Sequence, residues 1–72
     1  MDKGRLRGIV SAVIPSKDFG FIVVEGEEGE YFFHSTAVRG DFDDLAPGDK
    51  VEFDVVVGGK GKRAVGVEKK TA

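Results

Sequence analysis

The chain has 72 residues, of which 40% are hydrophobic, and it contains no cysteine and no tryptophan. A chain of this length buries only about 60% of the surface that its unfolded form exposes, which excludes a second domain and a large enclosed substrate pocket. The absence of cysteine excludes a disulfide framework and a thiolate metal site. We therefore expect one domain, residues 1–72, with a closed and well-packed shape such as a small barrel.

The net charge of −2 hides an uneven distribution along the chain. Residues 1–24 carry four cations and two acids (+2), residues 25–54 two cations and ten acids (−8), and residues 55–72 five cations and one acid (+4). Both ends are therefore basic and the middle is acidic. A positive strip results if the two ends fold onto one face, and the alternative is charge mixing that serves solubility alone.

The N-terminal segment does not resemble a signal peptide. Residues 1–7 are charged, and no apolar stretch of about seven or more residues follows them. No run approaches the roughly 20 apolar residues that cross a bilayer. We expect a cytoplasmic protein without membrane contact.

Hydrophobic residues recur with a period of two, and glycine separates the runs, which is typical of short strands. The predicted strands are Leu6 to Ile14, Phe19 to Val24, Glu30 to His34, Lys50 to Val57, and Arg63 to Glu68. Residues 35–38 allow only a single helical turn. Strands this short and this closely spaced indicate a five-stranded all-β barrel, because closure removes the sheet edges that invite aggregation.

Aromatic residues are concentrated in the second and third predicted strands. Alternation places Phe19 and Phe21 on one face of their strand, and Phe32 and His34 on one face of the next. A short turn over residues 26–29 makes the two strands hairpin neighbours, so the four side chains are expected to form one patch. Nucleobases stack on such a patch at roughly 1–3 kcal/mol per base, and Lys17 beside it suits a phosphate.

The alternative interpretation is that these phenylalanines belong to the core. The opposite face of the two strands already holds Ile22, Val24, Tyr31 and Phe33, and a chain of this length lacks material to cover both faces of the sheet. An exposed aromatic patch that can stack bases is therefore the favoured interpretation. His34 is expected to be a surface or hydrogen-bonded histidine, since no catalytic triad spacing or metal cluster accompanies it.

These segments resemble the paired ribonucleoprotein motifs of the cold-shock domain, a five-stranded antiparallel OB-fold barrel. The resemblance covers nearly the whole chain. Its parts are Gly8-Ile9-Val10, Lys17 to Ile22, Glu30 to His34 with Ala37, residues 42–48, Val51-Glu52-Phe53, Lys60-Gly61 and Ala64. It implies a protein that binds single-stranded RNA or DNA by stacking on the motif aromatics with low sequence preference, in a family whose members often act as RNA chaperones.

Carried over to this sequence, the resemblance implies that Phe19, Phe21, Phe32 and His34 contact bases and that Lys17 reaches the backbone. Phe42 is expected to add a peripheral stacking surface. In the last loop, Lys60, Lys62 and Arg63 are expected to meet phosphates. No cofactor or metal is implied, and we expect a monomer.

The chain departs from the family pattern at several positions. Ala12 and Val13 replace a tryptophan and a phenylalanine, Ile14 replaces an asparagine, and Ser35 replaces an aromatic residue. Asp18 replaces a glycine and puts a negative charge beside the patch. At about 1–3 kcal/mol per lost ring, these changes lower the expected affinity by one to several orders of magnitude.

Two other function classes are alternatives to this prediction. A barrel that has lost nucleic-acid binding would act as a protein-interaction module, through the acidic middle segment. An enzyme is disfavoured, because no nucleophile or paired-acid motif is present, and because residues 58–61 lack the strand-to-helix context of a phosphate-binding loop.

Overall fold

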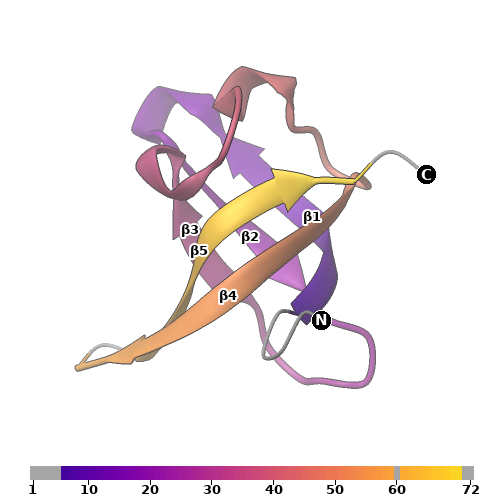
Figure 1. Cartoon of the computed structure of the whole chain (residues 1–72), viewed down its shortest axis with the longest axis vertical. Coiled ribbons are helices and arrows are strands. Elements are labelled where there is room, and N and C mark those ends of the chain that lie inside the picture. The colour runs from indigo at the N-terminus through magenta and orange to yellow at the C-terminus, as the bar shows by residue number, and fades with distance from the viewer. Residues whose placement is uncertain (1–5, 60, 71–72) are drawn as a thin grey trace.

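The computed structural model describes residues 6–59 and 61–70, over which five strands close into a barrel in the order β1-β2-β3-β5-β4 (Figure 1). The strands are β1 (Leu6–Ile14), β2 (Phe19–Val23), β3 (Tyr31–His34), β4 (Lys50–Gly58) and β5 (Gly61–Lys69). The all-β barrel is confirmed, and the observed strands lie within two residues of the predicted ones. The closing pair, β3 with β5, is parallel, whereas the other pairs are antiparallel.

Alternating residues of the strands point into the barrel and form its core. The core side chains are Val10, Ile22, Tyr31, Phe33, Leu45, Val51, Phe53, Ala64 and Val67, each at most 6% exposed. Gly20 is needed for this packing, because a Cβ there would lie 2.7 Å from Cζ of Phe33 and 2.6 Å from the carbonyl oxygen of Ala12. Ile22, Tyr31 and Phe33 therefore point into the barrel from the β2–β3 hairpin, as the sequence predicts.

A β-bulge lies in β1 where its register with β2 shifts between Val10 and Ala12. One extra residue in a strand reverses which of the following side chains point outward. Ile9 before the bulge is exposed, and Ala12 after it pairs with Phe21. The outer face of β1 is thus Ile9 on one side of the bulge and Ala12 and Ile14 on the other.

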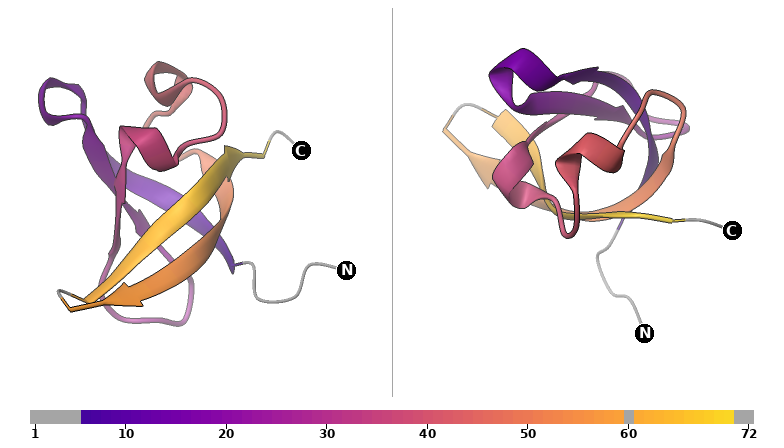
Figure 2. Two further views of the ribbon diagram at one scale, coloured as in Figure 1. Left: turned by 60° about the vertical axis from the view of Figure 1, so that its left-hand side comes forward. Right: turned by 90° about the horizontal axis from the view of Figure 1, so that it is seen from above.

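Three short 3-10 turns gather at one end of the barrel, and the β2–β3 turn lies at the other end (Figure 2). They are η1 (Pro15–Lys17), η2 (Ser35–Ala37) and η3 (Phe42–Asp44). The sequence predicts a single helical turn at η2 and does not predict η1 or η3; a helix of three residues is too short to show a periodic pattern. Leu45, which follows η3, is buried and closes this end of the core.

Candidate nucleic-acid interface

The β2–β3 hairpin brings three phenylalanine rings into mutual contact on its outer face. Phe21 pairs with Phe32 and Phe19 with His34. The ring centroid of Phe19 lies 5.6 Å from that of Phe21 and 5.4 Å from that of Phe32. The centroids of Phe21 and Phe32 lie 6.1 Å apart. We call Phe19, Phe21 and Phe32 the aromatic platform. Phe21 meets the other two rings edge to face, and the rings of Phe19 and Phe32 are tilted to each other, so these contacts orient the rings before any ligand arrives.

The platform is not part of the core. Its three rings are half-buried, whereas Phe33 on the opposite face of β3 is fully buried. Ala12 and Ile14 of β1 lie directly across from Phe21 and Phe19 and are also half-buried. The outer face therefore continues from the platform onto β1 with small or aliphatic side chains and no further ring.

His34 lies at the edge of the platform with its ring held by the start of η2. Nδ1 accepts a hydrogen bond from the backbone N–H of Thr36 at 3.2 Å and lies 3.0 Å from the Thr36 hydroxyl. Since Nδ1 is an acceptor, the neutral ring carries its proton on Nε2, where it can donate to a ligand. No group of three or more metal-ligating side chains occurs among residues 6–59 and 61–70.

Lys17 and Asp18 place opposite charges beside Phe19. Both are exposed, and Asp18 takes a left-handed conformation with φ 61° at the end of η1. Its carbonyl oxygen accepts a 2.8 Å hydrogen bond from the N–H of Ser35, which ties η1 to the start of η2. Lys17 and Asp18 therefore directly precede β2, and both side chains are exposed to solvent.

Arg63 is brought next to the platform by the parallel pairing of β3 and β5, in which it is the partner of Phe32. Two surface hollows adjoin this pair. One, of about 490 Å³, runs toward residues 58–59 and Lys62 of the β4–β5 hairpin. The other, of about 440 Å³, runs toward Thr36 and Arg39. Sequence reasoning missed Arg39, because nothing in the local pattern indicates that it approaches β5.

Lys62 is engaged with the core-facing side of β3. Its ammonium lies 4.9 Å from the centroid of the Tyr31 ring and 3.5 Å from the phenol oxygen. Tyr31 in turn donates a hydrogen bond to Glu27. This bond and the burial of the ring raise the pKa of the phenol, against the opposing effect of Lys62. Lys62 thus borders the hairpin hollow but is already held by Tyr31.

The structure does not bring Phe42 onto the platform. It packs against the core at the end of the barrel, with its ring centroid 6.1 Å from that of Phe33. This packing on Phe33 accounts for the half-buried state of Phe42. Lys60, the other predicted site residue of the last loop, lies outside the described residues.

A comparison with known families decides what this barrel is: the profile described as the "'Cold-shock' DNA-binding domain" matches residues 6–70. The chain belongs to the cold-shock domain family. Members of this family generally bind nucleic acids and are not enzymes. The resemblance drawn from the sequence motifs is thereby confirmed.

Curated relatives of this cold-shock domain match most of its length. Cold shock protein CspA of Staphylococcus haemolyticus is 42% identical over 64 residues, which are 88% of this chain and 96% of the relative. Cold shock protein CspB of Geobacillus stearothermophilus is 41% identical over the same shares. Cold shock-like protein CspD of Bacillus cereus is 46% identical over 54 residues, 74% of this chain and 80% of the relative.

A solved structure has the same fold as this cold-shock domain. It is described as drosophila Unr CSD456 and superposes with a TM-score of 0.79 at 24% sequence identity. The match covers 93% of this chain but 27% of the Drosophila chain, so it supports the barrel alone. Among the described residues, no helix is long and apolar enough to cross a membrane.

Proposed function

We propose that this cold-shock domain binds single-stranded RNA or DNA by stacking bases on the aromatic platform. The observation that carries the proposal is the contact of Phe19, Phe21 and Phe32 on a half-exposed face whose opposite side is the barrel core. Each base has a π-face, so rings held in this way accept any base. A duplex keeps its bases stacked inside, and the platform therefore favours unpaired strands.

Cations beside the platform support contacts with the sugar–phosphate backbone. Lys17 is exposed next to Phe19, and Arg63 is exposed next to Phe32. Such contacts position the strand without reading its sequence. Binding should weaken as salt rises, with a slope of about 0.7 per phosphate contact for a single strand.

The same geometry supports an RNA-chaperone role. Bases that stack on phenylalanine rings are withdrawn from pairing, so a bound transcript stays single-stranded over the contact. Stacking carries little sequence discrimination. Ala12 and Ser35 offer no ring, and we expect weak binding that exchanges quickly.

The test is fluorescence anisotropy of labelled oligothymidine and oligouridine, titrated at low and at physiological salt, with a duplex of matched length as the control ligand. Phe21→Ala should weaken binding, whereas Val57→Ala should not. Val57 is a suitable control because it is 74% exposed and lies on β4, which pairs with neither β2 nor β3.

Absence of binding at low salt would overturn the proposal. The barrel would then be better explained as a protein-interaction module, the alternative stated in the sequence analysis above. Equal binding of the duplex and the single strand would also overturn it, because duplex binding needs backbone contacts alone.

A further inference from the structure

A groove of about 440 Å³ lies between η2 and β5 and opens next to the platform. Phe32 and Arg63 line it where β3 pairs with β5, and Arg39 lines it further along β5. The backbone N–H of Arg39 donates to the carbonyl oxygen of Val67. Val67 is four positions after Arg63 in β5, a span of about 13 Å. We call this hollow the η2–β5 groove.

The walls of the η2–β5 groove are fixed by backbone hydrogen bonds. Val38 forms a parallel bridge with Val67, and the bond from Arg39 to Val67 is 2.7 Å long. At the other end of η2, the N–H of Thr36 is capped by His34. The groove therefore exists before a ligand binds, and little ordering is needed to use it.

The chemistry of the lining suits an anion. The polar side chains are His34, Thr36, Arg39 and Arg63, and no carboxylate belongs to the described lining. Two of these are guanidinium groups, which match phosphate oxygens with paired donors. The side chain of Arg39 is 66% exposed and so can turn toward the groove.

A neighbouring acid competes for Arg39. Oε2 of Glu68 lies 3.3 Å from Nη1 of Arg39, and Oε1 of Glu68 lies 3.8 Å from Nζ of Lys70. An exposed ion pair of this kind contributes little stability. A phosphate that reaches Arg39 can therefore share or replace Glu68 at small cost.

We propose that the η2–β5 groove binds the phosphodiester backbone of the strand after it leaves Phe32, between Arg63 and Arg39. This inference rests on the proposed function, since the platform holds the preceding bases. The groove extends the binding site beyond the rings through charge alone. It should accept a backbone without bases as readily as one with them.

The experiment uses an oligonucleotide of about four thymidines, which stacks on the platform, with abasic nucleotides added at its 5′ or its 3′ end. Abasic nucleotides contribute phosphates and no stacking surface. We expect the extension to tighten binding about threefold at low salt, at one end only. Arg39→Ala should abolish that gain and leave the affinity for the unextended oligothymidine unchanged.

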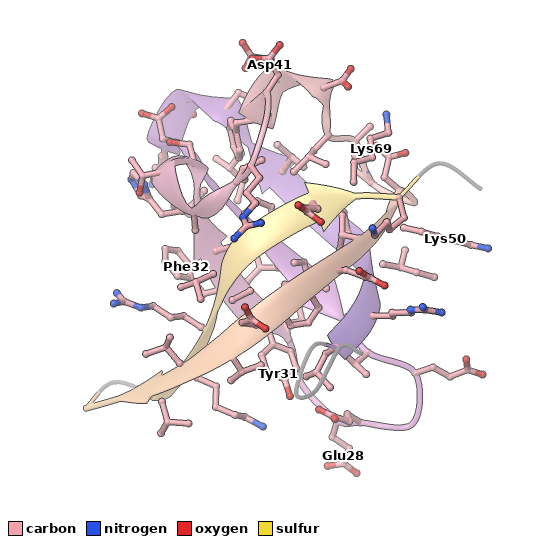
Figure 3. The ribbon with its side chains drawn as sticks, viewed as in Figure 1. Glu28, Tyr31, Phe32, Asp41, Lys50 and Lys69 are labelled. Carbon is pink, nitrogen blue, oxygen red and sulfur yellow. The ribbon has the colours of Figure 1, made fainter. Side chains whose placement is uncertain are left out.

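The control variant is Lys50→Ala, which removes one exposed cation on the opposite side of the barrel from Phe32 (Figure 3). It should retain the full gain. Glu68→Gln should enlarge the gain in the wild-type background and have no effect in the Arg39→Ala background. Thermal unfolding of each variant checks that the barrel is intact.

The outcomes separate this inference from the proposed function. If the unextended oligothymidine does not bind, the proposed function itself is overturned. If the unextended oligothymidine binds but no extension tightens binding, or if the gain survives Arg39→Ala, the proposed function stands. The inference that the η2–β5 groove binds the backbone is then overturned. Loss of the gain in Lys50→Ala to the same degree would also overturn it, because the effect would then be general electrostatic attraction.

Discussion

Phe32 and Arg63 are neighbours across the parallel pairing that closes the barrel, although they belong to different halves of the sequence. A half-buried ring and an exposed guanidinium thereby lie side by side, one suited to a base and the other to a phosphate. The pairing joins the aromatic platform to the basic C-terminal part of the chain. It is the arrangement on which the proposed function and the η2–β5 groove both depend.

The first prediction compares two adjacent residues of β3. Phe32→Ala should weaken single-strand binding by about 1–3 kcal/mol, or roughly five- to 150-fold, with little loss of stability. Phe33→Ala should lower the free energy of unfolding by about 3–5 kcal/mol, because Phe33 is fully buried. Anisotropy titrations and thermal melts on both variants check the split. Equal losses of stability would place the Phe32 ring in the core.

The second prediction is a gain of affinity from Ala12→Trp. Ala12 is the cross-strand partner of Phe21 on the outer face, so an indole there would extend the platform by one ring. We expect tighter binding by about 1–3 kcal/mol. The introduced indole also reports binding by fluorescence quenching, since the wild-type chain has no tryptophan. Ile9→Trp, on the outer face beyond the bulge, is the matched control and should give a smaller gain.

The third prediction concerns the acid beside Phe19. Asp18→Asn removes its charge but keeps a side chain that tolerates φ 61°, so it should tighten binding severalfold at low salt and less at physiological salt. Asp43→Asn makes the same charge change in η3 and should have little effect. If both variants gain equally, the benefit comes from net charge and not from the place of Asp18.

Asp18→Gly separates charge from backbone strain. Glycine adopts a positive φ without steric cost, so this variant should also stabilise the barrel by up to about 1 kcal/mol, as measured by thermal unfolding. Asp18→Asn should leave stability nearly unchanged. A fall in stability for Asp18→Gly would show that the aspartate side chain itself supports the turn.

The fourth prediction is a pH dependence of stability that arises from Glu52. Its side chain is 8% exposed, and its carboxylate oxygens lie 2.9 Å from Nε of Arg7 and 3.3 Å from Nζ of Lys70. Burial raises the pKa of Glu52, but the hydrogen bonds from Arg7 and Lys70 outweigh burial and hold the pKa below the ordinary value of 4.5. The ionised form therefore stabilises the barrel above pH 4.5, and this stabilisation is lost as the pH falls through the lower folded-state pKa.

Glu52→Gln should accordingly lower the thermal midpoint by a few degrees at pH 7, and the difference from wild type should shrink in acid. Glu28→Gln, an exposed acid of the β2–β3 turn, is the control and should leave the midpoint unchanged at both pH values. A difference between Glu52→Gln and wild type that is the same in acid and at pH 7 would indicate lost packing instead of lost charge.

The sequence by itself determined the strands and the faces of the β2–β3 hairpin. Side chains alternate strictly along a strand, so Phe19 and Phe21 had to share a face, as did Phe32 and His34. The short polar connection between them, with glycines at positions 26 and 29, favoured pairing of the two strands with each other as a hairpin. Local geometry is sufficient for inferences of this kind.

Only the tertiary structure decided which distant residues lie beside the platform and which pack elsewhere. The parallel contact of Phe32 with Arg63, the approach of Arg39 to Val67 and the packing of Phe42 on Phe33 all follow from barrel closure. Such pairings depend on the register between strands far apart in the chain, and on a bulge that reverses the outward face of β1. No periodicity in the sequence encodes that register, because it is set by the packing of the whole core.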